Sequence, residues 1–269
     1  KNRISPDPIS LVTHQIFLCF RETDIVIANG TSFIFKHHEK YYLVTNWHNV
    51  TGKNPETKAN LNPEGAIPDL IVTFFREKNN PGTCHPEHIQ LYSDENMFNP
   101  IWYEHPQYKE NVDVVVIPLN DNLLGKYDLY PINCISFDDD INPEVSDDVF
   151  IIGYPFSGTP YLQLPTWKRG SIASEPTINI DHLPKLLVDT ATRPGLSGSP
   201  VIYQRVGIHK LEKNGMVKSD TIIGRIRGFL GIYSGRIGQN EENAQLGIIW
   251  KSKVITEIIE SIPSSPFSP

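Results

Sequence analysis

Cysteine is scarce in this sequence. The 269 residues include only Cys19, Cys84 and Cys134, an odd number at spacings that match no metal-binding motif. A framework of disulfide bonds is therefore not expected, and we interpret the three residues as ordinary thiols in a reducing compartment. Phosphate-binding and other metal-binding motifs are missing as well, so we expect neither a metal nor any other cofactor.

Long apolar runs and an excess of basic charge are also missing. No apolar run is long enough to span a bilayer, and no signal peptide precedes the first strand. Because the first residue is Lys1 rather than Met, we expect a fragment or a processed chain. The net charge of −7 and the isoelectric point of about 5.7 give no reason to expect nucleic acid or a membrane surface as a partner.

Turn residues, by contrast, are frequent. With 22 Pro and 18 Gly between short runs rich in Val, Ile, Tyr and Phe, the pattern predicts an all-β protein. The strands expected in the first half lie near residues 11–20, 31–36, 41–46, 69–76, 88–93 and 112–118. Those expected in the second half lie near residues 148–153, 166–174, 185–190, 200–206, 223–234 and 245–250. Apolar residues at helical spacing predict a C-terminal helix over 253–260 that ends before Pro263.

This pattern predicts two packed, six-stranded antiparallel barrels followed by the helix. We expect the first barrel within residues 1–120 and the second within 148–269. Residues 121–147, which are rich in Asp, Asn and Pro, are expected to link them. A charged excursion over 207–221 is expected to form the tip of a hairpin.

The most informative segment is PGLSGSP at residues 194–200. A nucleophilic serine needs a tight turn that exposes its hydroxyl and leaves backbone N–H groups free to bind an oxyanion. Gly195 can adopt the backbone angles of such a turn, and Gly198 permits a close approach of another backbone. Because Gly, Ser and Pro also build ordinary loops, the alternative is that Ser197 is a turn residue without chemistry.

Suitable partners for Ser197 occur upstream. His48 ends an apolar strand, and Asp113 directly precedes an unbroken apolar run. The order His, Asp, Ser is one of the known orders of a catalytic triad. Asp24 and Asp69 are weaker candidates for the acidic role. Most of the other histidines are interpreted as solvated or structural, namely His37, His38, His85, His88, His105, His182 and His209.

Together these segments resemble the trypsin/chymotrypsin-like serine peptidases. The segment TNWHNV at 45–50 resembles the family's TAAHC block, and NVDVVVIPL at 111–119 resembles its block around the catalytic aspartate. The segment GLSGSP at 195–200 resembles GDSGGP. The stretch DTATRPG at 189–195 is closest to the bacterial HtrA-like branch. The resemblance covers nearly the whole chain and depends on three blocks in the right order.

The resemblance implies a serine endopeptidase that cleaves polypeptides through an acyl-enzyme. It implies Ser197 as the nucleophile, His48 as the general base and Asp113 as the residue that orients the histidine. The backbone N–H groups of Gly195 and Ser197 would hold the oxyanion. The scarcity of cysteine favours the bacterial cytoplasm as the compartment, with the periplasm as the alternative.

Substrate binding is harder to predict. In the family, an extended peptide pairs with a strand that follows the nucleophile, and here that strand would include Ile232, Tyr233 and Ser234. The primary pocket would be lined by Ala191 and Thr192, with no acidic residue at its base. A small or apolar side chain before the scissile bond is therefore expected, rather than Arg or Lys.

Two departures from the family bear on activation. Secreted members place Cys after the catalytic histidine, where this chain has Asn49. They place Asp before the nucleophile, where it pairs with a newly cut N-terminal amine, and Leu196 cannot form that pair. Activation by N-terminal trimming is thus not expected. The alternatives are a latent protease switched on by an activating protein or an additional domain, a peptide-binding module that does not cleave, and an esterase.

Overall fold

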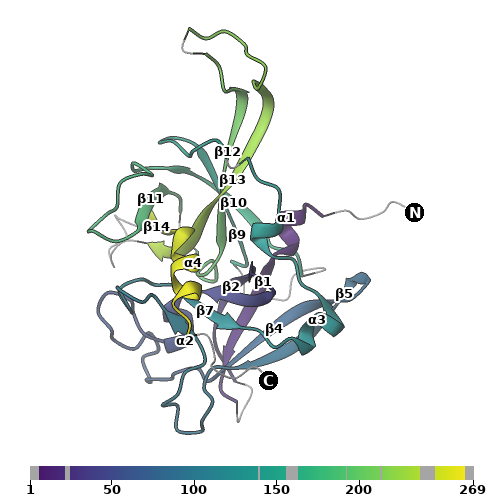
Figure 1. The fold of residues 1–269 in the computed structure, drawn as a ribbon. Helices are drawn as coiled ribbons and strands as arrows, with labels where there is room; N and C mark the ends of the chain where they lie inside the picture. The colour runs from purple at the N-terminus through teal and green to yellow at the C-terminus, as the bar shows by residue number, and fades with distance from the viewer. Residues whose placement is uncertain are drawn as a thin grey trace.

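The computed structural model describes residues 6–21, 25–138, 140–155, 163–191, 193–212, 214–236 and 246–263. Within these ranges the chain folds into two antiparallel sheets, one from each half of the sequence (Figure 1). The first half of the chain lies below the second in this view, and a C-terminal helix runs along the seam. None of the described helices is both long enough and apolar enough to cross a lipid bilayer.

The first sheet follows a short helix, α1 (Pro8–Leu11), whose first turn is capped by the side chain of Asp7. Its strands run in the order β5-β4-β1-β2-β3-β7-β6, and β8 pairs with β4. Their bounds are β1 (Thr13–Cys19), β2 (Val26–His37), β3 (Lys40–Thr45), β4 (Leu70–Glu77), β5 (Asn80–Gln90), β6 (Tyr103–Glu104), β7 (Val115–Pro118) and β8 (Tyr127–Asp128). Six of the eight strands have four or more residues; β6 and β8, which have two residues each, were not predicted.

The second sheet closes into a six-stranded barrel in the order β10-β11-β14-β13-β12-β9. Its strands are β9 (Asp148–Gly153), β10 (Thr166–Ile172), β11 (Lys185–Asp189), β12 (Pro200–His209), β13 (Ile222–Arg236) and β14 (Leu246–Lys251). All six lie where the sequence predicted strands, and the all-β class is confirmed. The end of β12 and the start of β13 extend beyond the barrel as a hairpin, which projects from the top of Figure 1.

Strand β7 explains why the first half carries an unbroken apolar run. Val115 and Ile117 belong to the core of the first sheet, whereas Val116 belongs to a second core shared with the C-terminal helix. A strand that is buried on both faces needs apolar residues at every position rather than at alternate ones. The run therefore marks the layer between the two cores, and Asp113 lies two residues before its first paired residue.

The C-terminal helix, α4 (Lys253–Glu260), is confirmed with the predicted bounds. It buries Val254, Ile255, Ile258 and Ile259, the i, i+1, i+4 and i+5 positions of one helical face. These side chains share a core with residues of β2 and β7, so a helix that follows the second barrel packs against the first sheet.

Strand β5 is the clearest difference from the prediction. The strand was expected only near residues 88–93, yet β5 starts at Asn80 and pairs with β4. Its Pro and Gly residues disfavour a strand in isolation. Because β5 lies at the edge of the sheet, proline is tolerated there, and pairing with β4 outweighs local propensity. The predicted linker, residues 121–147, contains three short elements: α3 (Asn122–Lys126), the 3₁₀ helix at Ile132–Cys134 and β8. The division of the chain into two domains and a linker stays a prediction.

A buried histidine in β1 makes the stability of the fold depend on pH. The His14 side chain donates through Nδ1 to the Phe74 carbonyl at 3.0 Å and is only 4% exposed. Burial, aided by the positive charge of Arg76, lowers its pKa from 6.5 to about 4, although the bond to Phe74 opposes the shift. His14 is therefore neutral in the folded state at pH values where the unfolded chain already binds a proton.

We expect the free energy of unfolding to fall by about 3 kcal/mol through this group as the pH drops from 7 to 4. The contribution of His14 to the free energy of unfolding is complete above pH 6.5 and is lost as the pH falls toward the pKa of His14 in the folded state. Urea unfolding at several pH values measures it, and His14→Gln should reduce the slope. His182→Gln, at an exposed position, is the control. Equal slopes for wild type and His14→Gln would contradict the prediction.

Candidate active site

His48 lies in the first turn of a short helix, α2 (Trp47–Thr51), which directly follows β3. The helix ends at Gly52, whose φ of +66° is the left-handed conformation that favours glycine. At the other end, Asn46 donates through its side-chain amide to the backbone carbonyl of Asp113 at 2.7 Å. The segment that carries His48 is thereby fixed to the segment that carries Asp113.

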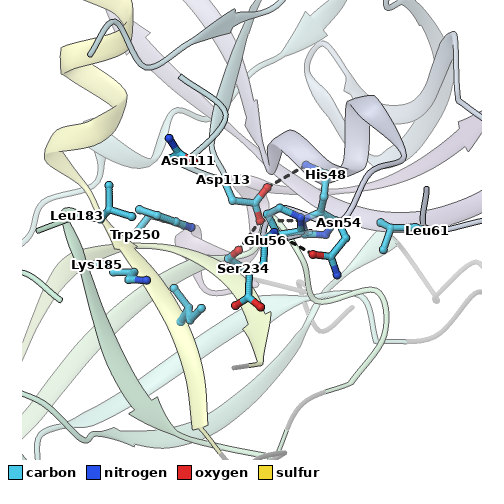
Figure 2. A pocket seen from close by; sticks show the side chains of 12 residues that line it. His48, Asn54, Glu56, Leu61, Asn111, Asp113, Leu183, Lys185, Ser234 and Trp250 are labelled. Atoms are coloured by element: carbon cyan, nitrogen blue, oxygen red, sulfur yellow. Dashed lines mark hydrogen bonds and ion pairs between the residues drawn. The ribbon is translucent and has the colours of Figure 1, made fainter. Parts of the chain in front are cut away.

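Asp113 is committed to His48 through both carboxylate oxygens. Its Oδ1 accepts the backbone N–H of His48 at 2.9 Å, and its Oδ2 lies 2.7 Å from Nδ1 of the imidazole. Oδ2 also accepts a hydrogen bond from the hydroxyl of Ser234. The carboxylate is buried, whereas the imidazole is 13% exposed. This arrangement fixes the ring with Nδ1 toward Asp113 (Figure 2). Nε2 has no hydrogen-bond partner within the described ranges of the chain.

The segment around Ser197 forms the tight turn that the sequence predicted. The N–H of Leu196 donates to the carbonyl of Arg193 at 3.4 Å, and Gly195, after Pro194, has a φ of +89°. Proline followed by a glycine with positive φ is typical of a type II turn. A Cβ atom at Gly195 would lie 2.3 Å from the Tyr154 carbonyl oxygen, so no other residue fits there without rearrangement.

Two backbone N–H groups of this turn have no hydrogen-bond acceptor among the described residues. The Leu196 carbonyl accepts from the N–H of Ser199 at 3.0 Å, which orients the peptide between Leu196 and Ser197. Among the described residues, neither the Gly195 N–H nor the Ser197 N–H donates to a protein acceptor. These are the two groups predicted to bind an oxyanion.

Ser197 and His48 line the same cavity of about 410 Å³, together with Gly195, Asn29 and Asn49. Within the described part of the chain, no hydrogen bond joins the Ser197 hydroxyl to the imidazole. Proton transfer between them would need a closer approach, and catalytic contacts commonly tighten in this way when a substrate binds.

A set of hydrogen bonds between the first half of the chain and the second barrel holds the turn in place. Thr31, in β2, donates from its N–H to the Ser197 carbonyl and from its hydroxyl to the Gly195 carbonyl, each at 2.8 Å. The side-chain amide of Asn49 donates to the Ser197 carbonyl at 3.2 Å and to the Thr45 hydroxyl at 2.9 Å. The sequence showed Asn49 only as a departure from the family pattern and gave no signal for Thr31.

Comparison with known proteins decides the family. A model of the trypsin-like peptidase domain matches residues 30–207, a span that includes His48, Asp113 and Ser197. The chain belongs to the trypsin-like peptidase family. It is a serine peptidase, as predicted. A search of curated proteins found no match to the chain.

Two similar solved structures are forms of the Rv3671c protease from M. tuberculosis. The active form is 14% identical, with a TM-score of 0.44, and the alignment covers 98% of this chain and 91% of that one. An inactive form with serine replaced by alanine is 17% identical, with a TM-score of 0.47, and the alignment covers 97% and 98%.

The residues predicted to bind substrate differ in exposure. Ala191 is exposed, and Thr192 lies outside the described residues. The side chains of Ile232 and Tyr233 are 0% and 1% exposed, and this part of β13 is paired with β12 and β14 on both edges. Their role in substrate binding stays a prediction. Ser234 instead directs its hydroxyl to Asp113.

Asn49 offers a test of how firmly the peptidase holds the turn around Ser197. Asn49→Ala removes one of the two donors to the Ser197 carbonyl while Thr31 keeps the other. A hydrogen bond of ordinary strength then predicts a loss of about tenfold in kcat with little change in KM. Steady-state kinetics measure it, with Asn96→Ala at an exposed position as the matched control. Wild-type kcat in Asn49→Ala would show that Thr31 alone fixes the turn.

Proposed function

We propose that this serine peptidase cleaves polypeptides with Ser197 as the nucleophile, His48 as the general base and Asp113 as the residue that orients His48. The observation that carries the proposal is the double hydrogen bond from His48 to Asp113, at 2.9 and 2.7 Å. It leaves Nε2 as the nitrogen available to take a proton, on a ring that shares a cavity with Ser197.

In this mechanism, the Ser197 hydroxyl attacks the carbonyl carbon of the scissile bond as His48 takes its proton. Asp113 stabilises the imidazolium that results. The Gly195 and Ser197 N–H groups bind the oxyanion, and each such donor contributes roughly 3–4 kcal/mol in comparable sites. His48 then returns the proton to the leaving amine, which leaves an acyl-enzyme that water hydrolyses.

The turn geometry favours a site that is ready at rest over a latent protease that awaits an activator. A latent site would turn one of its oxyanion donors away from the substrate or bond it to the protein. Here both candidate donors are uncommitted within the described residues. The three cysteines form no disulfide bond with one another, and we propose the reducing bacterial cytoplasm as the compartment, since no disulfide is needed to hold the site.

A fluorophosphonate probe, which reacts with activated serines, tests the proposal. We expect it to label the wild type and not Ser197→Ala. Ser199→Ala is the matched control, because the Ser199 hydroxyl is buried without a partner among the described residues; it should label as the wild type does. A folded wild type that is not labelled would contradict a working site at rest and favour the latent protease or the non-cleaving module.

A further inference from the structure

The hairpin of β12 and β13 projects from the end of the second barrel that lies away from the first sheet (Figure 1). The two strands pair with each other as far as His209 and Ile222. Strand β9 pairs with β12 only up to Gln204, and β14 pairs with β13 only from Gly231 onward. Among the described residues, the outer part of the hairpin therefore has no third strand beside it. A pair of strands in this situation is only marginally stable unless something packs against it.

One face of the projecting hairpin is apolar and bare. Val206, Ile208 and Ile223 are 71%, 53% and 74% exposed. Ile208 lies opposite Ile223 in the register, and Val206 is two residues before Ile208, so the three side chains share one face. At the tip, three further apolar residues are exposed, namely Leu211, Met216 and Val217. A continuous apolar surface on a projecting element indicates a face that a partner covers.

The opposite face of the hairpin is covered by the protein itself. Ile226 and His209 belong to that face and are 0% and 5% exposed. Arg205, which lies opposite Ile226 in the register, forms an ion pair with Asp147 at 2.6 Å. The hairpin thus packs against its own chain on one side, and only the side that carries Val206, Ile208 and Ile223 lacks a partner.

Two charges of opposite sign lie unpaired at the two ends of this bare face. Arg225 is exposed at the base, opposite Val206, and Glu212 is exposed at the tip; neither forms an ion pair with a described residue. The other described charged side chains of segment 205–227 are ion-paired: Arg205 with Asp147, Lys210 with Asp140, Lys218 with Asp220 and Arg227 with Asp7. Because Val206 and Glu212 are separated by roughly 20 Å of extended chain, Arg225 and Glu212 of one molecule are too far apart to pair.

We propose that this bare face is a dimer interface between two copies of the chain. The two hairpins pack face to face about a two-fold axis and run antiparallel, so that the base of each meets the tip of the other. Val206, Ile208 and Ile223 of each copy are buried between them. Arg225 of each copy pairs with Glu212 of the other, and the axis makes this contact twice.

A second copy is the occupant that the charges select, because it brings the complementary charge to each end of the same apolar face. The hairpin points away from the first sheet (Figure 1). The dimer therefore leaves the seam between the two sheets, where the proposed active site lies, open to substrate.

Sedimentation equilibrium at several protein concentrations tests the proposal without any need for turnover. We expect the wild type to approach twice the monomer mass of 30.5 kDa. Arg225→Glu, or Glu212→Arg, places like charges together at both ends of the interface and should raise the dimer Kd by about a hundredfold. Lys40→Glu, at an exposed position outside the hairpin, is the matched control and should dimerise as the wild type does.

Restored charge pairs make the test specific. The double variant Arg225→Glu/Glu212→Arg should dimerise with a Kd close to that of the wild type. An equimolar mixture of the two single variants should form a heterodimer, because both of its contacts then join opposite charges. A wild type that keeps the monomer mass at its solubility limit would overturn the proposal. A dimer that neither single substitution weakens, or that the double variant does not restore, would overturn it as well.

Discussion

His48→Ala is expected to reduce kcat by about a millionfold while the protein stays folded. Loss of the base in a comparable triad removes the whole triad contribution, because the serine hydroxyl is a weak nucleophile at neutral pH. The fold should persist because the backbone N–H at position 48 still bonds to Asp113 Oδ1 and Ser234 still bonds to Oδ2. The buried carboxylate thus keeps partners. Hydrolysis of fluorescently labelled casein measures the effect.

The control for His48→Ala is His182→Ala, at an exposed position, which should retain wild-type turnover. Thermal unfolding of both variants separates loss of catalysis from loss of fold. Turnover above about a hundredth of the wild-type rate in His48→Ala would mean that another group takes the Ser197 proton, since even modest general-base catalysis contributes 10²-fold or more.

The elements with strong local patterns were predictable from the sequence. The strands of the second barrel and the helix over 253–260 combine regular apolar spacing with clear turn residues. The candidate triad was found for a related reason: His48 and Asp113 adjoin strands whose apolar residues are unmistakable, and Ser197 lies between two glycines. Gly195 and Gly198 both have positive φ. Glycine adopts this conformation more readily than other residues, so the two glycines indicated the turn from the sequence.

Features that depend on pairing between distant segments were not predictable. The burial of Ile232 and Tyr233 follows from β13 having partners on both edges, and nothing within the strand's own sequence distinguishes a central strand from an edge strand. Ser234 gave no local sign that it would bond to Asp113, 121 residues away in the chain. Thr31 is 164 residues from the Gly195 carbonyl to which it donates. The residues that hold Asp113 and the turn around Ser197 in place are thus brought together by the contact between the first sheet and the second barrel.

That contact also explains how the nucleophile turn can do without the ion pair of the secreted relatives. Leu196, which replaces the expected Asp, is fully buried in the core of the second barrel. The carbonyls on either side of it are held instead by Thr31 and Asn49 from the first barrel. Apolar burial combined with hydrogen bonds from the opposite barrel fixes the turn without a charge or a cut N-terminus.

Asp113→Asn is expected to lower kcat by about 10⁴-fold without unfolding the protein. The carboxylate accepts on both sides: Oδ1 from the His48 backbone N–H, and Oδ2 from the imidazole Nδ1–H and the Ser234 hydroxyl. An amide has a single oxygen and cannot accept on both sides. With its oxygen toward the backbone, its NH₂ faces Nδ1 and forces the proton onto Nε2. The imidazole then has no lone pair with which to take the Ser197 proton.

The opposite orientation of the amide places its NH₂ against the backbone N–H of His48, which leaves two buried donors in contact and no acceptor between them. Either orientation therefore damages the site, whereas Ser234→Ala removes a single donor and leaves the tautomer intact; we expect it to cost about tenfold. Casein hydrolysis by the two variants gives the ratio. Similar losses in both would indicate that Asp113 acts through the Ser234 contact and not through the tautomer of His48, and would remove it from the proposed triad.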